Sequence, residues 1–139
     1  MKIVLDTNIL LAIIGRRSPY RWLFDCLIDG RIALCVSNEI LLEYKEVLSR
    51  KTNAEIAQNI INFIDTHTST VRTAVYFNFG LITEDPDDNK FVDCAISANA
   101  NYLVSNDAHF RILKTNDFPR VAVMSLDEFS SSFQEEFSD

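Results

Sequence analysis

Short apolar runs alternate with longer amphipathic stretches along almost the whole chain. Five of these runs have the length and the apolar or β-branched content of buried strands, namely Ile3–Leu5, Ile32–Val36, Val71–Phe79, Tyr102–Ser105 and Val121–Met124. Helix-like segments lie between them, and this alternation is typical of a parallel sheet with helices on both faces. The sequence therefore predicts an α/β fold of three layers, α/β/α, around a parallel sheet of about five strands.

Start and stop residues mark the helices that we expect between the strands. Ser37 is suited to cap a helix over 38–50, and Thr52 or Asn53 to cap the next one. Asp85 followed by a proline predicts a helix that runs to about residue 100, and Gly30 lies just after a helix over 19–28. No repeat or Pro/Gly-rich linker divides the chain, so we expect one domain over residues 1–139.

The charge balance limits the kinds of partner. With 13 Lys and Arg against 20 Asp and Glu, the net charge is −7, which argues against a broad basic surface for nucleic acid and against docking on an anionic membrane. No segment has the roughly 18 consecutive apolar residues that span a bilayer. Cys26, Cys35 and Cys94 form no CxxC pair, so we expect buried thiols in a reduced, cytoplasmic setting. The positions of the acids are therefore more informative than their number.

Two acids stand where predicted strands end. Asp6 directly follows Ile3–Leu5, and Asp107 follows Tyr102–Ser105 by one residue. Ligands of open parallel sheets bind beyond the carboxyl ends of the strands, so both acids are candidates for a site at that edge. The alternative is that each aspartate only caps the helix that follows it.

Glu43 is the third candidate. At 100° per residue it lies about 60° from Ile40, at the edge of the apolar stripe of its helix. Glu39 and Glu46 lie further round, about 100° and 120° from it. Glu43 is thus the acid of this helix that leans furthest toward the core, although an acid at such a border often reaches water instead.

Asp88 is the fourth candidate, in the first turn of the helix after Asp85. It lies about 60° from Phe91 and so inside the apolar arc, whereas Asp93 lies outside it at about 200°. Asp87, at about 320°, is close enough to the arc to compete with Asp88. The helix dipole also favours acids in a first turn, which is a purely structural explanation for either residue.

The four acids together suggest more than each does alone. Carboxylates that converge repel one another, and a divalent cation between them removes that cost. Ligation by oxygen alone indicates Mg²⁺ or Mn²⁺ rather than zinc. His67 and His109 form no zinc-like set with the cysteines, and we expect both at the surface, with His109 close to Asp107 in sequence.

Four segments of the chain, in order, resemble the PIN domain, the metal-dependent ribonuclease fold of VapC-type toxins. They are IVLDTNILLA, SNEILLEYKEVLSR, DPDDNKFVDCAISANANYLVSND and FPRVAVMSLDEF. The resemblance implies that Asp6, Glu43, Asp88 and Asp107 are the catalytic, metal-binding acids. It makes Asn8, Asp93 and Ser105 peripheral members of the site, and one departure is Asn106, where this branch often has glycine.

The resemblance also implies an activity. We expect hydrolysis of RNA phosphodiester bonds, with Mg²⁺ or Mn²⁺ activating a water for in-line attack and Asp6 and Asp88 as the main ligands. It implies an antitoxin protein as partner and a homodimer. RNA would be gripped by Arg16, Arg17 and Arg21, which lie among aromatic residues, although this segment can equally be a solvated turn.

Two other classes of protein are compared with this interpretation. A receiver-like phosphoacceptor domain needs an aspartate after the third strand and a lysine after the fifth, and the chain has neither. The second alternative is a catalytically weak or inactive PIN-like scaffold that binds RNA or a protein partner. The complete set of four acids favours the nuclease.

Overall fold

The computed structural model describes residues 1–137 and contains one parallel sheet with the strand order β3-β2-β1-β4-β5. The strands are β1 (Lys2–Leu5), β2 (Ala33–Val36), β3 (Val71–Arg72), β4 (Tyr102–Val104) and β5 (Val123–Met124). All four pairings between neighbouring strands are parallel. The predicted fold class, a parallel sheet of about five strands between helices, is confirmed.

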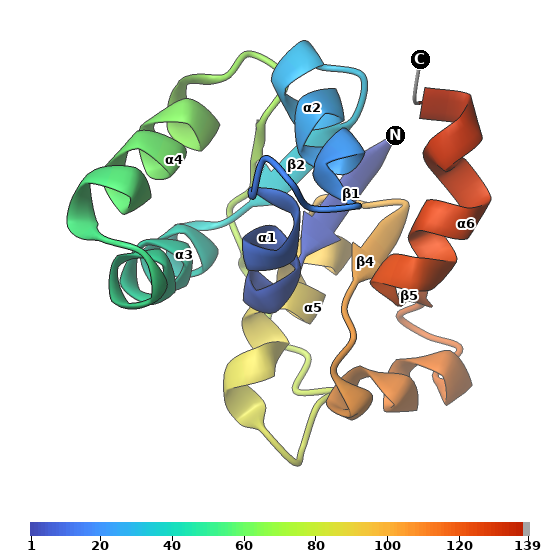
Figure 1. Cartoon of the computed structure of the whole chain (residues 1–139). Coiled ribbons are helices and arrows are strands. Elements are labelled where there is room, and N and C mark those ends of the chain that lie inside the picture. Colours follow the sequence, from blue (N-terminus) through green and yellow to red (C-terminus); the bar gives the residue numbers. More distant parts are fainter. Residues whose placement is uncertain (138–139) are drawn as a thin grey trace.

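Helices cover the sheet on both sides. They are α1 (Thr7–Ile13), α2 (Arg21–Asp29), α3 (Asn38–Lys51), α4 (Ala54–Thr66), α5 (Asn89–Ser97) and α6 (Leu126–Phe137), with two 3-10 segments, η1 (Pro86–Asp88) and η2 (Ala108–Thr115). Helix α5 packs against β1, β2 and β4, and Figure 1 shows α1 on the opposite side of the sheet. Helix α6 contacts β5 and α2, and α4 packs on α3. The fold therefore has three layers, with the sheet between two layers of helices.

Strand β1 lies at the centre of the sheet, between β2 and β4. Ile3, Val4 and Leu5 are completely buried, as expected for a strand that is covered on both faces. Leu5 pairs with Val104, so β1 and β4 end at the same edge. The backbone N–H of Asp6 continues the ladder by donating to the Val104 carbonyl at 3.1 Å. The topology thus brings the residues that follow both strands to one place.

Several predicted helix boundaries are confirmed by their capping bonds. The Ser37 hydroxyl accepts the N–H of Ile40 at 3.3 Å, and the Asn53 side chain accepts the N–H of Ile56 at 2.8 Å. Gly30 ends α2 with φ of +75°, a left-handed conformation that favours glycine. The local sequence therefore determines where these helices begin and end.

The predicted third strand is mostly wrong. Only Val71 and Arg72 of the Val71–Phe79 run form a strand, paired with Cys35 and Val36 at the end of β2. Strand β2 stops there because Ser37 begins the next helix, so the following residues have no strand to pair with. The chain instead forms a long connection over 73–85, in which Tyr76 is 84% exposed.

The chain also departs from expectation nearer to its C-terminus. The helix after Asp85 begins as 3-10 segment η1 and α5 ends at Ser97, because Asn99 takes a positive φ of 52°. Segment η2 was not expected, and the buried Phe110 and Leu113 anchor it to the core.

All three cysteines are buried thiols, as expected. No helix within residues 1–137 is long and apolar enough to cross a membrane.

Candidate functional site

Asp6 is the most buried acid of the candidate site, with 7% of its surface exposed. It lies at the N-cap position of α1 but makes no side-chain capping bond there. Its carboxylate instead accepts a hydrogen bond from the Ser105 hydroxyl, 2.8 Å from Oδ2. Burial raises the pKa of Asp6, the Ser105 bond opposes that rise, and the charges of Asp107 and Glu43 add to it. Asp6 therefore lies close to the other acids, and it also accepts a bond from the backbone of the adjacent Thr7.

Ser105 connects Asp6 to Asp107. Its hydroxyl oxygen accepts a hydrogen bond from the backbone N–H of Asp107 at 3.0 Å, and the same hydroxyl donates a hydrogen bond to Asp6. The Asp107 carboxylate accepts the N–H of His109 at 2.9 Å and thereby caps η2. Capping is thus part of the role of Asp107, as the alternative interpretation held, yet the residue also lies close enough to Asp6 for their charges to interact.

Glu43 points from α3 toward α1 and α5. Its side chain is only 18% exposed. Oε2 accepts a hydrogen bond from the Thr7 hydroxyl, and Oε1 lies 2.8 Å from the Lys90 ammonium group. Both carboxylate oxygens are therefore held by side chains, one from the residue next to Asp6 and one from α5.

Asp88 is the last residue of η1 and precedes α5, and its side chain is 16% exposed. Burial raises its pKa to about 6, a hydrogen bond from His109 opposes this, and the charges of Asp85, Asp107 and Asp6 add to the rise. His109 Nδ1 lies 3.1 Å from Asp88 and 3.4 Å from Asp107. Its bond to Asp88 raises the pKa of His109. Asp88 is thus electrostatically coupled to both acids at the strand ends.

The structure brings the four candidate acids together. They come from the end of β1, from α3, from η1 and from the residues after β4. Asp6 interacts with Asp107 and Glu43, and Asp88 interacts with Asp6 and Asp107. The donors are all oxygen, and the pKa values of Asp6 and of Asp88 are raised first by burial and then by the charges of neighbouring acids. The donor set fits a hard divalent ion.

A second group of possible ligands shares Asp88. One ligand atom each of Asp85, Asp88 and His109 lies within 4.8 Å of the others. His109 therefore belongs to the surroundings of the acids, whereas the sequence suggested a surface role for it. The sequence did hold a clue to this position, since His109 lies two residues after Asp107. Asp107 caps η2 by accepting the N–H of His109, and this turn places the imidazole beside the acids.

Asp87, the competitor of Asp88, and Asp93, the peripheral candidate, have other partners. Asp87 is 74% exposed and pairs with Lys90 at 3.1 Å. Asp93 is 2% exposed and accepts the N–H of Phe79 at 3.1 Å. Its expected position outside the buried arc was wrong, because the connection over 73–85 covers that face of α5. Burial, and then the charge of Glu39, raise the pKa of Asp93. Asp87 and Asp93 both line a cavity of about 510 Å³.

Asn8 does not contact the acids through any hydrogen bond within residues 1–137. It is exposed and lines a different, open hollow of about 700 Å³, together with apolar residues of α1 and Ile56 of α4. The adjacent Thr7 is the residue that contacts the site, through Glu43. The hydroxyl of Thr7, next to Asp6, could have been picked out in the sequence as a possible site residue. Its partner could not, because the contact with Glu43 depends on where α3 lies.

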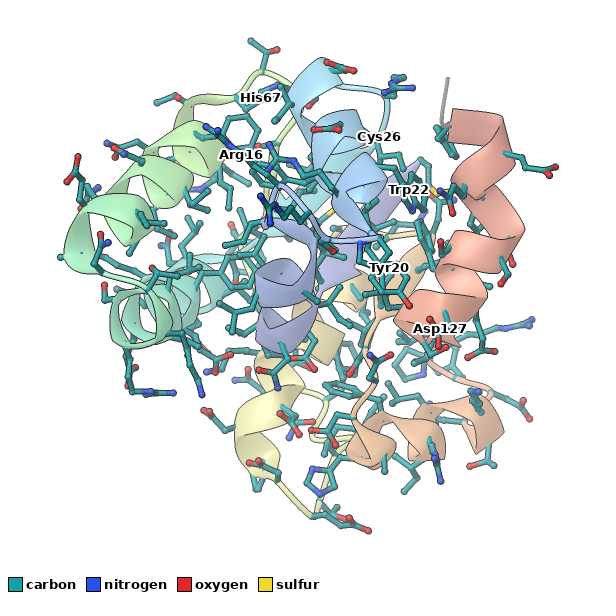
Figure 2. The ribbon with its side chains drawn as sticks, viewed as in Figure 1. Arg16, Tyr20, Trp22, Cys26, His67 and Asp127 are labelled. Atoms are coloured by element: carbon teal, nitrogen blue, oxygen red, sulfur yellow. The ribbon has the colours of Figure 1, made fainter. Side chains whose placement is uncertain are left out.

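The basic cluster lies away from the acids. Arg16 lies beyond the C-terminal end of α1, near α2 and α4 (Figure 2), and the seven-residue helix separates this end from Asp6 by about 10 Å. Arg16 and Arg17 are exposed. Arg21 pairs with Asp25 at 3.1 Å and lies over the ring of Phe24, so it is held on its own helix. The structure does not bring these arginines to the four acids.

Comparison with solved structures gives similar folds. VapBC2 from Rickettsia felis, bound to a promoter DNA fragment, superposes with a TM-score of 0.61 at 20% identity over 90% of this chain and 98% of that chain. DNA-bound VapBC from Salmonella typhimurium gives 0.57 at 17% identity, over 91% and 98%. FitAB bound to the IR36 DNA fragment gives 0.55 at 14% identity, over 89% and 94%.

At the level of sequence, no curated protein matches the chain. The family model for the PIN domain does match, over residues 2–109. This span includes all four acids, Lys90 and His109. The chain therefore belongs to the PIN domain family.

Proposed function

We propose that the protein is a metal-dependent endoribonuclease that hydrolyses RNA phosphodiester bonds. The observation that carries the proposal is the convergence of Asp6, Glu43, Asp88 and Asp107 from four separate elements. Asp6 and Asp88 each raise the free energy of the folded state when ionised, because burial raises their pKa values. A cluster that is unfavourable in isolation is typical of a functional site.

The proposed cofactor is Mg²⁺ or Mn²⁺. Asp6 and Asp88 would be its main ligands, and Asp107 and Glu43 would complete the site directly or through waters. A divalent ion at this position would activate water and screen the charge of the scissile phosphate.

The chain's own residues orient these groups. The Ser105 hydroxyl holds Oδ2 of Asp6. Thr7 and Lys90 fix the two oxygens of Glu43. His109 lies between Asp88 and Asp107 and can donate to either. Such supporting bonds hold catalytic carboxylates in a productive geometry.

We further propose that the protein is the toxin of a toxin–antitoxin pair in the cytoplasm and that it forms a homodimer. The solved structures with this fold include VapBC and FitAB assemblies with DNA, which supports this class of partner. The open hollow along α1, with the partly buried Leu11 and Ile14 and the exposed Ile56, suits an apolar segment of a protein partner.

The test of the activity uses single-stranded RNA with Mg²⁺ or Mn²⁺. We expect cleavage by the native protein, none in the presence of a chelator, and a loss of at least about 100-fold in Asp6→Asn. The matched control is Asp117→Asn, which removes an exposed acid outside the site. Equal cleavage by Asp6→Asn would contradict the proposal, and binding without cleavage by the native protein would favour the scaffold.

Arg16 and Arg17 enter this proposal as contacts to RNA away from the point of cleavage, because of their position beyond α1. Changing both to Ala should weaken RNA binding and reduce its dependence on salt. Arg21 is the weakest of the three, since Asp25 already neutralises it.

A further inference from the structure

Lys90 is the one basic side chain, within residues 1–137, that forms an ion pair with any of the four acids apart from His109. Its ammonium group lies 2.8 Å from Glu43 Oε1 and 3.1 Å from Asp87. Its side chain is 13% exposed. As the second residue of α5 it stands three residues after Asp87, on the same face, so the start of the helix directs it toward α3.

The burial of a charged lysine side chain between α3 and α5 calls for a physical explanation. An ion pair that is largely removed from water gains little stability over an apolar pair of the same size, because both charges lose their hydration. The stem of a methionine would fill the same space between α3 and α5. The retained charge is therefore better explained by what it does to the acids than by packing.

The four acids fall into two groups by their partners. Glu43 has its oxygens occupied by Lys90 and by Thr7. Asp6, Asp88 and Asp107 have no Lys or Arg partner in the part of the chain that the structure describes, and they couple to one another. One side of the site thus has the ammonium group of Lys90, whereas the basic group on the other side is the imidazole of His109, beside Asp88 and Asp107.

Charge arithmetic leads to the same division. If only the four carboxylates, Lys90 and the metal are counted, the charge is −4 from the acids, −3 with Lys90 and −1 with one divalent ion. A second divalent ion beside Glu43 would lie within a few ångströms of the ammonium group, and the two like charges would repel. Without Lys90, two divalent ions would balance the charge of the four carboxylates themselves.

We infer that Lys90 takes the place of a second metal ion, so that the site binds one divalent ion through Asp6, Asp88 and Asp107 while Glu43 stays paired with Lys90. This inference rests on the proposed function, because it concerns the same site. Lys90 is a positioning residue here: it holds Glu43 and sets how many ions the carboxylates accept.

The test is the number of Mn²⁺ ions bound per chain, measured on the purified protein by the loss of the free Mn²⁺ signal in electron paramagnetic resonance. We expect one ion for the native protein and two for Lys90→Met, which keeps the length of the side chain and removes its charge. Lys90→Arg keeps the charge and should bind one. The matched control is Lys114→Met, which removes an exposed lysine of η2 and should also bind one.

The double variant Lys90→Met, Glu43→Gln should return to one ion, because the second ion needs Glu43. Circular dichroism melts establish that each variant is folded before the titration. Two ions in the native protein, one in Lys90→Met, or two in the double variant would overturn the inference. The first two results leave the proposed metal-dependent activity standing, whereas a native protein that binds no Mn²⁺ overturns the proposed function and the inference with it.

Discussion

Replacing Asp88 by Asn should make the metal-free protein more stable at neutral pH. The pKa of Asp88 rises from its ordinary 3.8 to about 6 in the folded chain, chiefly because of burial. An acid with a raised folded-state pKa opposes folding when it is ionised. Above about pH 6 the group is ionised in both the folded and the unfolded state, so the full penalty is present there. The penalty shrinks as the pH falls from about 6 toward 3.8, and it is lost only below that, where the group is protonated in both states.

The size of the effect follows from the shift. A difference of about two pKa units corresponds to about 3 kcal/mol. Because the side chain is partly accessible to solvent, screening reduces this, and we expect about 1–2 kcal/mol in the free energy of unfolding. The amide oxygen of asparagine can still accept the hydrogen bond from His109, so little stabilisation is lost on that side.

Urea unfolding of the native protein and of Asp88→Asn gives the measurement, at pH 7.5 and pH 4.0 with a chelator, and with Asp117→Asn as control. The stabilisation should be present in full at pH 7.5 and much smaller at pH 4.0. With Mn²⁺ the order should reverse, since an ion at 100 times its dissociation constant stabilises the native protein by about 2.7 kcal/mol. A variant that is less stable than the native protein in chelator at pH 7.5 would refute the reasoning.

Three further substitutions test the surroundings of the site and the fold. Ser105→Ala removes the donor to Asp6 and should weaken Mn²⁺ binding by about 10-fold, measured by isothermal titration calorimetry; unchanged affinity would show that the bond does not orient Asp6. Phe91→Ala leaves a cavity under α5 and should lower the free energy of unfolding by about 3–5 kcal/mol in urea, and a change under 1 kcal/mol would contradict its burial. Gly30→Ala should cost about 1 kcal/mol, seen as a lower melting temperature, because φ there is +75° while the added methyl group meets only ordinary contacts at 3.7 Å.

The central part of the fold follows from local sequence. Ile3–Leu5 is apolar without interruption, which is the pattern of a strand buried on both faces, and the same pattern before Ser105 places a second strand. Once both strands are parallel, the residues after them must meet at one edge. The positions of Asp6 and Asp107 could therefore be predicted from topology alone.

The third strand could not be predicted in this way. Residues 71–79 have the composition of a strand, but the length of an edge strand is limited by the length of its neighbour, and β2 ends at Val36. The unpaired residues then form the connection that buries Asp93. A helical wheel for α5 assumes that only the face toward the sheet is buried. It therefore could not predict the burial of Asp93, which lies under a loop on another face.

The partners of the acids were equally hidden from the sequence. Lys90 is separated from Glu43 by 47 positions, and their contact depends on the packing of α3 against α5. His109 reaches Asp88 only because Asp107 caps a 3-10 segment that the sequence did not predict. The residues of a candidate site can be selected from pattern, whereas the bonds that orient them arise from long-range packing.

The most direct test of the account is the position of Mn²⁺ in a crystal soaked with the ion, located by its anomalous scattering. We predict one peak within coordination distance of the carboxylates of Asp6 and Asp88, close to Asp107. The absence of a peak among these acids, or a peak only between Asp85 and His109, would contradict the proposed metal centre.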